Sequence, residues 1–488
     1  MPYVSLNPAT GKVIQEFSSW NERQLNVALE NARHAQEAWS AIDFAQRAEA
    51  MCRVTERLLT NRDDYATLIT QEMGKPLREA HAEVAKCAVA CDYYARHGKD
   101  FLTDEPIETD ATRSYVTYQP LGTILAVMPW NFPFWQVFRA AAPALMAGNA
   151  MVLKHASNVP RCALAIEEIF RAAGLPDHLF ATLMIDADQV AAVIADPRVR
   201  AVTFTGSEPA GRLVAAEAGR NLKKCVLELG GSDPFIVLRD ADLDDASTQA
   251  VNSRYLNAGQ SCIAAKRFIL TPEIADEFVF LLKQKVAALK LGDPMKKTTR
   301  VGPMARLDLR DELHRQVADS IAQGARPILG CGPATGKGAY YLPSILDHVT
   351  PKTCAYREEL FGPVALIIRA KNERDAIKIA NDSRFGLGSS LWSRDAVRAE
   401  KLSRQIEAGG CFINGMVKSD PRLPFGGIKD SGFGRELSYH GIHEFVNIKT
   451  VWVKQLSSPC PQPRSPRSRQ TPICRPRKSR AARKPTSN

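Results

Sequence analysis

Residues 201–231 read AVTFTGSEPAGRLVAAEAGRNLKKCVLELGG, and this stretch decides the fold. An apolar run precedes the turn at FTGS, a helix-like segment opens near Pro209, and a second apolar run ends at ELGG. Short apolar strands separated by helices are typical of βαβ units, whose strands lie parallel in one sheet. The stretch therefore predicts an α/β fold.

The same alternation extends in both directions from this stretch. Upstream, the apolar runs GTILAVMPW (122–130) and AMVLKH (150–155) precede helix-like segments at 134–147 and about 160–173. Downstream, a second series begins with DPFIVL at 233 and includes a helix containing 240–258, CIAAKRFIL (262–270) and a helix at 274–290. Further strand candidates after 363 are VALIIR, SSLWS and GCFING. Two α/β lobes are the simplest architecture.

Three segments fall outside the two series. Residues 22–100 are rich in Glu, Ala, Arg and Leu, with few breakers before Gly74-Lys75-Pro76, and are predicted to be helical. SYVTYQP (114–120) and NIKTVWV (447–453) are strand-like runs that belong to neither lobe.

The charge of the chain is concentrated at its C-terminal end. The formal net charge is +11, but residues 455–488 carry nine Lys or Arg and no acid, which leaves +2 for residues 1–454. With seven prolines and few apolar residues, this tail is expected to be disordered. It is interpreted either as an arm for nucleic acid or a membrane surface or as a dispensable extension, such as one from a shifted reading frame. We favour the extension.

The composition of the whole chain is that of a soluble globular protein, since 45% of its 488 residues are hydrophobic and 24% are charged. Its length predicts two or three domains. No apolar run is long enough to span a bilayer, and the N-terminus lacks the pattern of a secretory signal. The eleven cysteines include no C-x-x-C pair. Reduced thiols in a cytoplasmic protein without a metal site are therefore expected.

Cys262 stands in NAGQSCIAAKR, where a Gly-containing turn meets an apolar run, so its sulfur is expected at the end of an element. A free thiol has a pKa near ~8.5, and a nucleophilic cysteine needs nearby donors or dipoles that populate its thiolate. Taken alone, this residue is more simply a small buried hydrophobe. The neighbouring motifs favour a nucleophile instead.

Glu228 lies in VLELGGSDP, where an apolar strand meets Gly230 and Gly231. Partial desolvation there raises the pKa of a carboxyl group toward the range of a general base. The two glycines let backbone pass close to a ligand. An ordinary surface or capping glutamate fits this segment equally well.

Two further segments are candidates for ligand contacts. Asn131, in MPWNFPFWQ, is bracketed by Pro129 and Pro133, and an amide held in this way is a good donor to an oxyanion. FTGSEPAG (204–211) follows a strand and opens a helix, whose N–H groups bind phosphates. A packed loop without a catalytic role would explain the Asn131 segment equally well. The spacing of the glycines in FTGSEPAG differs from G-x-G-x-x-G, so this segment alone is a weak indication of a dinucleotide site.

Together, PWNFP, FTGS, ELGG, GQSC, EELFGP and PFGGIKDSGFGRE closely resemble the motifs of the aldehyde dehydrogenase superfamily, in order, across roughly residues 5–453. The amino-acid sequence is most similar to that of bacterial succinate-semialdehyde dehydrogenases, in particular their NADP-accepting branch. The resemblance implies two Rossmann-like lobes and a small β oligomerisation domain. It divides the chain into a dinucleotide-binding domain (1–101 and 121–230), a catalytic domain (231–441), oligomerisation strands (102–120 and 442–454) and the tail (455–488).

The resemblance also implies a mechanism. Cys262 attacks the aldehyde, the Asn131 amide and the Cys262 N–H stabilise the oxyanion, and Glu228 activates water to hydrolyse the thioester. Glu436, in GRE, matches a second carboxylate sometimes assigned to proton relay. Expected cofactor contacts are Trp130, Lys154, Ser157, Gly206, Ser207, Gly211, Leu229, Glu359 and Phe361.

Ser157 bears on the choice of cofactor. NAD-specific relatives usually carry an acid at this position, which would repel a 2′-phosphate, whereas a serine can donate to it and Lys154 can pair with it. We therefore expect NADP to be preferred and NAD to be accepted. A helix cap indifferent to the cofactor is the alternative.

Arg139 matches an arginine that binds the distal carboxylate of succinate semialdehyde, and Ser419 and Phe425 are expected beside it. A surface arginine is the alternative for Arg139. A second arginine of some relatives is Leu256 here, Arg254 is out of position, and Ser419 or Lys418 is a candidate for the missing contact.

Several alternatives remain open at this point. Glutarate semialdehyde and aliphatic aldehydes are further substrates, and CoA-acylating dehydrogenation is a further reaction, which the Glu of ELGG disfavours. A non-catalytic or nucleic-acid-binding protein is disfavoured by the intact Cys262, Glu228 and Asn131. The family's flanking strands imply a homodimer or homotetramer.

Overall fold

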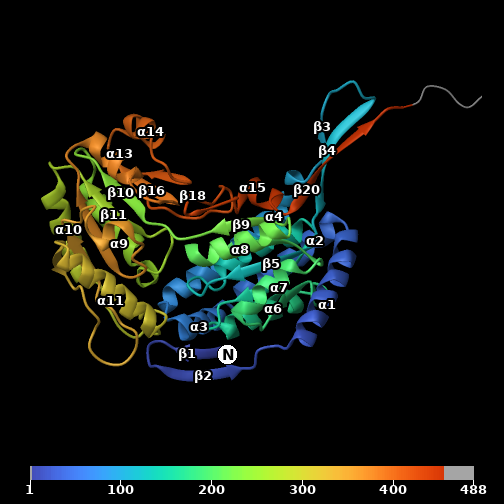
Figure 1. The fold of residues 1–488 in the computed structure, drawn as a ribbon, viewed down its shortest axis with the longest axis horizontal. Helices are drawn as coiled ribbons and strands as arrows, with labels where there is room; N and C mark the ends of the chain where they lie inside the picture. Colours follow the sequence, from blue (N-terminus) through green and yellow to red (C-terminus); the bar gives the residue numbers. More distant parts are fainter. Residues whose placement is uncertain (1–2, 456–488) are drawn as a thin grey trace, which may run out of the picture.

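The computed structural model describes residues 3–455. Two α/β lobes lie side by side, and a β arm projects from one of them (Figure 1). Apart from Gln455, the basic tail predicted over 455–488 lies outside the described residues. In the part of the chain that is described, no helix combines the length and apolarity needed to cross a bilayer.

The first lobe is built on a six-stranded sheet that contains the stretch quoted above. Its strands, in spatial order, are β19 (Gly432–Phe433), β9 (Lys224–Glu228), β8 (Val199–Thr205), β5 (Thr123–Met128), β6 (Ala150–His155) and β7 (Phe180–Thr182). All neighbours are parallel except β19, which pairs antiparallel with β9. The predicted parallel sheet is confirmed.

Helices cover both faces of this sheet. One face packs against α2 (Phe44–Thr60), α3 (Arg62–Met73), α4 (Leu77–Phe101), α5 (Trp135–Met146) and α6 (Pro160–Ala172). The other face packs against α1 (Glu22–Ala41), α7 (Val190–Ala195) and α8 (Glu208–Arg220). Strand residues alternate between the two cores, with Ile124 and Ala126 in one and Leu125 in the other, because successive side chains of a strand point to opposite faces.

The order of the strands creates a crevice. From β5 the chain winds through β6 and β7 on one side of the sheet and then returns to β8 and β9 on the other. Ligands of open α/β sheets bind outside the carboxyl ends of the strands where the winding reverses. Here that point lies between β5 and β8, followed by Pro129–Asn131 and Gly206–Ser207.

The second lobe is built on a seven-stranded sheet. Its strands, in spatial order, are β12 (Arg326–Leu329), β13 (Ser344–Asp347), β14 (Val364–Arg369), β11 (Ala265–Leu270), β10 (Asp233–Val237), β16 (Gly388–Trp392) and β17 (Gly410–Ile413). One face packs against α9 (Leu243–Tyr255) and α10 (Ala275–Ala287). The other packs against α11 (Leu307–Ala322), α12 (Cys354–Arg357), α13 (Glu373–Asn381) and α14 (Ala396–Ser403).

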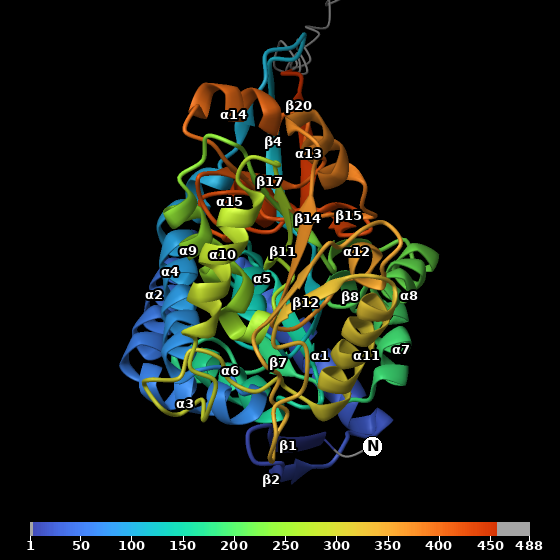
Figure 2. The same cartoon turned by 90° about the vertical axis from the view of Figure 1, so that its left-hand side faces the viewer.

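The two strand-like segments left over by the sequence pair with each other. They are β4 (Arg113–Pro120) and β20 (Val446–Val453), and β3 (Glu105–Pro106) completes a three-stranded antiparallel arm. The arm stands away from both lobes (Figure 2). Smaller elements are the hairpin of β1 (Tyr3–Asn7) and β2 (Lys12–Phe17), the pair β15 (Phe385–Gly386) and β18 (Ile428–Lys429), the short helix α15 (Ser438–His443), and the 3₁₀ turns η1 (Ala187–Gln189) and η2 (Leu256–Gly259).

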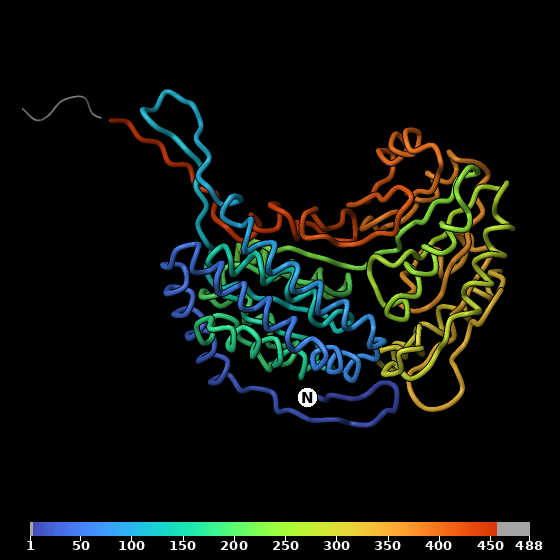
Figure 3. The backbone as a smooth tube through the Cα atoms, turned by 180° about the vertical axis from the view of Figure 1, so that it is seen from behind, coloured from blue at the N-terminus to red at the C-terminus, as the bar shows by residue number. Residues whose placement is uncertain are grey.

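The C-terminal part of the chain returns to the first lobe earlier than the sequence predicts. Residues 432–433, assigned above to the second lobe, form β19 beside β9, and Phe425 and Leu437 belong to the core of the first lobe. Figure 3 shows this red segment running from the second lobe over the first to the arm. It carries Glu436 into the first lobe, which matters for the site.

Candidate active site

Cys262 lies between the two lobes, in the turn that joins η2 to β11, and it lines two cavities. One cavity opens along the carboxyl edge of the first sheet. The other extends between α4, α5 and the segment that carries residues 416–425. A single sulfur atom therefore faces both spaces.

The backbone before Cys262 adopts an uncommon conformation. Asn257 and Ala258 have φ values of 53° and 52°, a region that residues other than glycine rarely occupy. The Asn257 side chain donates to the carbonyl oxygens of Asn131 and Gln260, at 2.8 and 3.0 Å. These bonds hold the Asn131 loop against the Cys262 turn, and such strain is typical of functional sites.

Asn131 itself is buried and held at both ends of its amide. Its Nδ2 donates to the Gln260 carbonyl at 3.1 Å, and its Oδ1 accepts from Gln136 Nε2 at 3.1 Å. One N–H of the amide remains for an oxyanion, because the NH₂ group has two donors. The structure thus brings Asn131 beside Cys262 in a fixed orientation.

The cavity at the sheet edge has a volume of about 260 Å³. Six of the nine predicted cofactor contacts line it, namely Trp130, Gly206, Ser207, Leu229, Glu359 and Phe361, while Gly211 packs behind Leu229. Trp130 and Phe361 meet edge to face with ring centres 5.9 Å apart.

Ser207 is the N-cap of α8, and its hydroxyl makes no capping hydrogen bond. The first N–H groups of this helix are therefore directed to the cavity without a side-chain cap, as in other phosphate sites. Gly211 allows a close approach, because a Cβ there would lie 2.4 Å from Leu229 Cδ2.

Lys154 and Ser157 lie at the carboxyl end of β6, the next strand along the edge, beyond the wall of this cavity. Lys154 donates to the His155 carbonyl at 3.0 Å, and burial lowers its pKa. Ser157 is exposed in the turn before α6. Their placement suits the far end of an extended ligand whose other end lies at Cys262.

Glu359 is fixed on the opposite wall. Its carboxylate pairs with Lys266 at 3.1 Å and accepts from the Gly231 N–H at 3.1 Å. Lys266 also donates to the carbonyl oxygens of Ser261 and Cys262. This lysine, which the sequence did not single out, links the glutamate to the nucleophile turn.

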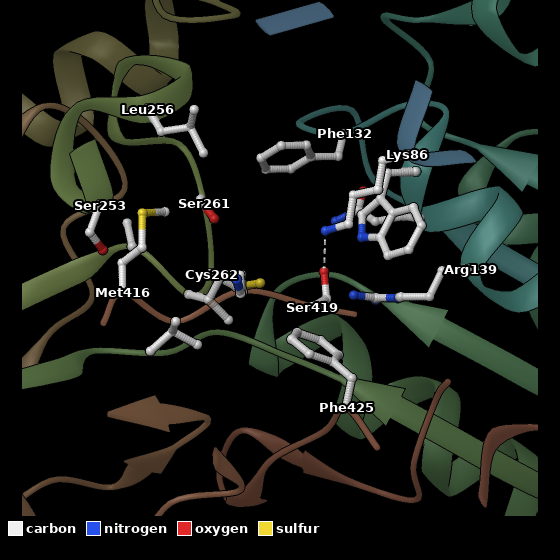
Figure 4. A pocket seen from close by; sticks show the side chains of 16 residues that line it. Lys86, Phe132, Arg139, Ser253, Leu256, Ser261, Cys262, Met416, Ser419 and Phe425 are labelled. Atoms are coloured by element: carbon white, nitrogen blue, oxygen red, sulfur yellow. Dashed lines mark hydrogen bonds between the residues drawn. The ribbon is translucent and has the colours of Figure 1, made fainter. Parts of the chain in front are cut away.

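The second cavity, of about 100 Å³, carries the cationic groups (Figure 4). Lys86, Arg139 and Ser419 lie together in the close-up, with Phe425 below them and Cys262 beside them. Leu256 and Lys418 also line this cavity. The predicted substrate residues Arg139, Ser419 and Phe425 are therefore brought to one place.

The environment of Arg139 differs from the prediction in one respect. Arg139 is 2% exposed, which excludes the surface interpretation, and it forms a buried ion pair with Glu436. It also donates to Thr205 Oγ1 at 3.3 Å and stacks over the Phe425 ring. Its charge is thus largely balanced within the protein, and Glu436 is engaged by Arg139 rather than free to relay protons.

Glu228 is buried at the end of β9, and neither of its carboxylate oxygens has a hydrogen-bond partner among the described residues. Burial raises its pKa well above the usual range, and Glu436 raises it further, while Arg139 opposes this. Because Arg139 pairs with Glu436, it is less able to stabilise the ionised form of Glu228. A buried carboxyl group of this kind is suited to general acid–base work.

Cys262 differs from the sequence expectation of an ionised thiol. Burial raises the pKa of its thiol to about 12, although Arg139 and Lys266 act to lower it. Desolvation exceeds the effect of the two cations because both have carboxylate partners. In the protein without ligands, the nucleophile is therefore a protonated thiol.

Lys86, like Lys266, is a residue of the site that the sequence analysis missed. It lies on α4, three residues after the buried Glu83 and four before the buried Ala90. A lysine on the buried face of an amphipathic helix is an unusual placement that signals a function, and this signal was available from the sequence. Arg254, by contrast, is buried against the carbonyl oxygens of Leu360 and Val364, away from the cavity, as predicted.

The described residues contain no cluster of three or more His, Cys, Asp or Glu arranged to hold a metal ion. The groups gathered around the two cavities are the Cys262 thiol, the Asn131 amide, the carboxyl groups of Glu228, Glu359 and Glu436, and the cations Lys86, Arg139 and Lys266.

Comparisons with known proteins agree with this geometry. The model of the aldehyde dehydrogenase family matches residues 2–451. A probable NADP-dependent succinate-semialdehyde dehydrogenase of Synechocystis is 52% identical over 453 residues, which is 93% of this chain and 100% of the relative. The NAD(P)-dependent succinate semialdehyde dehydrogenase Sad of Escherichia coli is 49% identical over 93% of this chain and 98% of its own.

A solved structure shows the same fold. The succinic semialdehyde dehydrogenase of Streptococcus pyogenes, in complex with NADP⁺, superimposes with a TM-score of 0.91 at 40% identity, covering 93% of this chain and 100% of the other.

Proposed function

The chain belongs to the aldehyde dehydrogenase family, and from this premise we propose that it oxidises succinate semialdehyde to succinate with NADP, accepting NAD as well. The observation that carries the proposal is the position of Cys262 between two unlike cavities. One is a crevice at the carboxyl edge of a parallel sheet, and the other ends in cationic side chains.

The residues of the crevice fit a dinucleotide. An uncapped helix N-terminus at Ser207 suits a pyrophosphate, and the paired aromatic rings of Trp130 and Phe361 suit a flat ring. Lys154 and Ser157 are placed for the adenosine end, where a serine tolerates a 2′-phosphate. The dinucleotide supplies a nicotinamide ring that accepts a hydride.

The residues of the second cavity fit a short aldehyde with a carboxylate at its far end. Phe425 and Phe132 line an apolar middle, and Lys86, Arg139 and Ser419 provide charge and hydrogen bonds. The same cationic end would leave an aliphatic aldehyde such as butanal with polar groups that it cannot satisfy, which lowers its affinity.

The chain's own residues carry the chemistry around the hydride transfer. Cys262 gives its proton to solvent water as its sulfur bonds to the aldehyde carbon, and the Asn131 amide donates to the resulting oxyanion. Loss of the hydride from that carbon leaves a thioester. Glu228 then takes a proton from water as the water adds to the thioester, and the carbon–sulfur bond breaks to release the acid and the thiol.

The arm provides the surface for self-association that we propose. β20 is an edge strand, and its Ile448, Trp452 and Val453 side chains are exposed. Exposed edge strands with apolar side chains pair with other chains. We propose a homodimer or homotetramer in the cytoplasm, and light scattering of the purified protein measures the mass directly.

The deciding experiment is steady-state turnover of a panel of aldehydes with each dinucleotide. We expect kcat/KM for succinate semialdehyde with NADP to exceed that for butanal by at least about 100-fold, because charged hydrogen bonds discriminate by this order. Glutarate semialdehyde is the intermediate case. Cys262→Ala is the control and is expected to abolish turnover. Equal specificity constants for the two aldehydes would contradict the proposal.

A further inference from the structure

Lys86 is a half-buried cation whose ammonium packs against an aromatic ring instead of an acid. Its ammonium lies 4.1 Å from the centre of the Trp135 ring and donates to Ser419 Oγ at 2.6 Å (Figure 4). Among the described residues it forms no ion pair within 4.0 Å, whereas Arg139 on the neighbouring helix is paired with Glu436. The two cations of the cavity are therefore not equivalent.

An unpaired ammonium in such a place is costly for the folded protein. Ionised groups away from water are stable only when paired and hydrogen-bonded, and Lys86 has a hydroxyl and an aromatic ring but no counter-charge. An anionic ligand in the cavity would supply that charge. The arrangement is thus built for a ligand that brings a carboxylate.

Ser419 completes the receptor. Because its oxygen accepts from Lys86, its O–H hydrogen is left to donate to another acceptor. Two donors, an ammonium and a hydroxyl, then lie side by side on the wall that also includes Cys262. A carboxylate has two oxygens and accepts from such a pair.

We propose that Lys86, acting with Ser419, is the principal counter-charge for the distal carboxylate of the substrate, and that Arg139 mainly holds Glu436. The inference rests on the proposed function, since it assigns the recognition of the semialdehyde's carboxylate. Leu256, which lines the same cavity, brings no charge, so Lys86 is the second cation of this cavity wall beside Arg139.

The charge of Lys86 is sensitive to pH. Burial, together with the nearby Arg139, lowers its pKa to about 8. The charged and titratable groups around it are Arg139 on α5, Glu83 and Cys87 on its own helix, and Asp420 on the facing segment, which pairs with Arg422. Glu83 and Asp420 act to raise the pKa of Lys86, but their effect is smaller than that of burial and Arg139.

The first test compares Lys86→Met with the unsubstituted enzyme on two aldehydes. We expect kcat/KM for succinate semialdehyde to fall about 10- to 100-fold, the usual loss for a charge-assisted contact, while that for butanal changes less than about threefold. Lys99→Met, an exposed lysine of the same helix, is the matched control and is expected to change neither value.

The second test needs no substitution of Lys86. In the unsubstituted enzyme, the ratio of kcat/KM for succinate semialdehyde to that for butanal is expected to fall about tenfold between pH 7 and pH 9, since a group with a pKa near 8 loses its proton there. The ratio cancels the ionisations of Cys262 and Glu228, which both substrates share. Lys86→Arg keeps its charge and is expected to keep the ratio flat over this range.

The outcomes separate the inference from the proposed function. If the unsubstituted enzyme does not distinguish the two aldehydes, the proposed function fails. If it does distinguish them, but Lys86→Met keeps the same preference or loses both activities equally, and the ratio is independent of pH, the role of Lys86 is refuted.

Discussion

The two cavities that meet at Cys262 are built in different ways. The cofactor cavity is formed largely where neighbouring strands of the first sheet end, at Pro129–Asn131, Gly206–Ser207 and Leu229–Gly230. The substrate cavity is formed by α4, α5 and residues 416–425, which are far apart in the sequence. The first follows from topology, and the second follows from tertiary packing. Their charge also differs, since Lys86, Arg139 and Lys418 line the substrate cavity, whereas the acid Glu359 lines the cofactor cavity.

We predict that Glu228 serves only the hydrolysis of the thioester, which is the second half of the reaction. Glu228→Gln keeps the size of the side chain but removes the base, so steady-state turnover should fall about 10²- to 10⁴-fold. One equivalent of reduced dinucleotide should still form rapidly, because acylation of Cys262 does not require the base that activates water. Rapid-mixing absorbance measures both phases.

The absence of that first burst in Glu228→Gln would show that Glu228 also takes the proton from Cys262. Because burial raises the pKa of Glu228, its ionised form increases with pH. Turnover of the unsubstituted enzyme limited by thioester hydrolysis should therefore rise with pH, and that of Glu228→Gln should not follow the same curve.

The reactivity of Cys262 tests whether the site is active before the ligands bind. Since burial raises the pKa of the thiol to about 12, alkylation of Cys262 in the ligand-free protein should increase about tenfold per pH unit, or about 10³-fold from pH 7 to 10. Mass spectrometry of the peptide that contains residue 262 measures the rate, with the exposed Cys52 as an internal reference. A plateau below pH 8 would mean that the thiolate is already formed.

The sequence indicated which residues lie together at the edge of the first sheet because strand ends are local features. The motifs that placed Trp130, Ser207 and Glu228 each follow an apolar strand, and parallel strands align their carboxyl ends at one edge. The parallel sheets and the pairing candidates for the arm followed from the same alternation. The positions of these residues required no knowledge of distant contacts.

The substrate side could not be predicted to the same depth. Nothing local to Arg139 shows that Glu436 is its partner, because the C-terminal segment crosses back to the first lobe only in the folded chain. The raised pKa of Cys262 likewise depends on burial by both lobes. Lys86 was the exception, since its place on a buried helical face was visible in the sequence.

The two cations of the substrate cavity should therefore differ in their effect on stability. Arg139→Leu leaves Glu436 buried without a partner and should lower the free energy of unfolding by about 3 kcal/mol, the lower end of the cost of breaking a buried pair. Lys86→Met removes an unpaired charge and should not lower it. Urea unfolding followed by tryptophan fluorescence compares the two variants.

The double variant Arg139→Leu/Glu436→Leu is the control for this comparison. Replacing both partners removes the unpaired charge, so most of the lost stability should return. A similar loss in Arg139→Leu and Lys86→Met would contradict the division between a structural and a ligand-binding cation.

The smallest predicted effect concerns the far end of the cofactor cavity. Ser157→Glu places a carboxylate where the 2′-phosphate of NADP is expected, so the ratio of kcat/KM with NADP to that with NAD should fall at least about tenfold, corresponding to roughly 1.4 kcal/mol of repulsion. Gln284→Glu, an exposed residue of α10 in the other lobe, adds the same charge away from the site and should leave the ratio unchanged. Because Ser157 is exposed in a turn, stability should not change in either variant. An unchanged or raised ratio in Ser157→Glu would place cofactor discrimination elsewhere, and Lys154 would then be the remaining candidate at this end of the sheet.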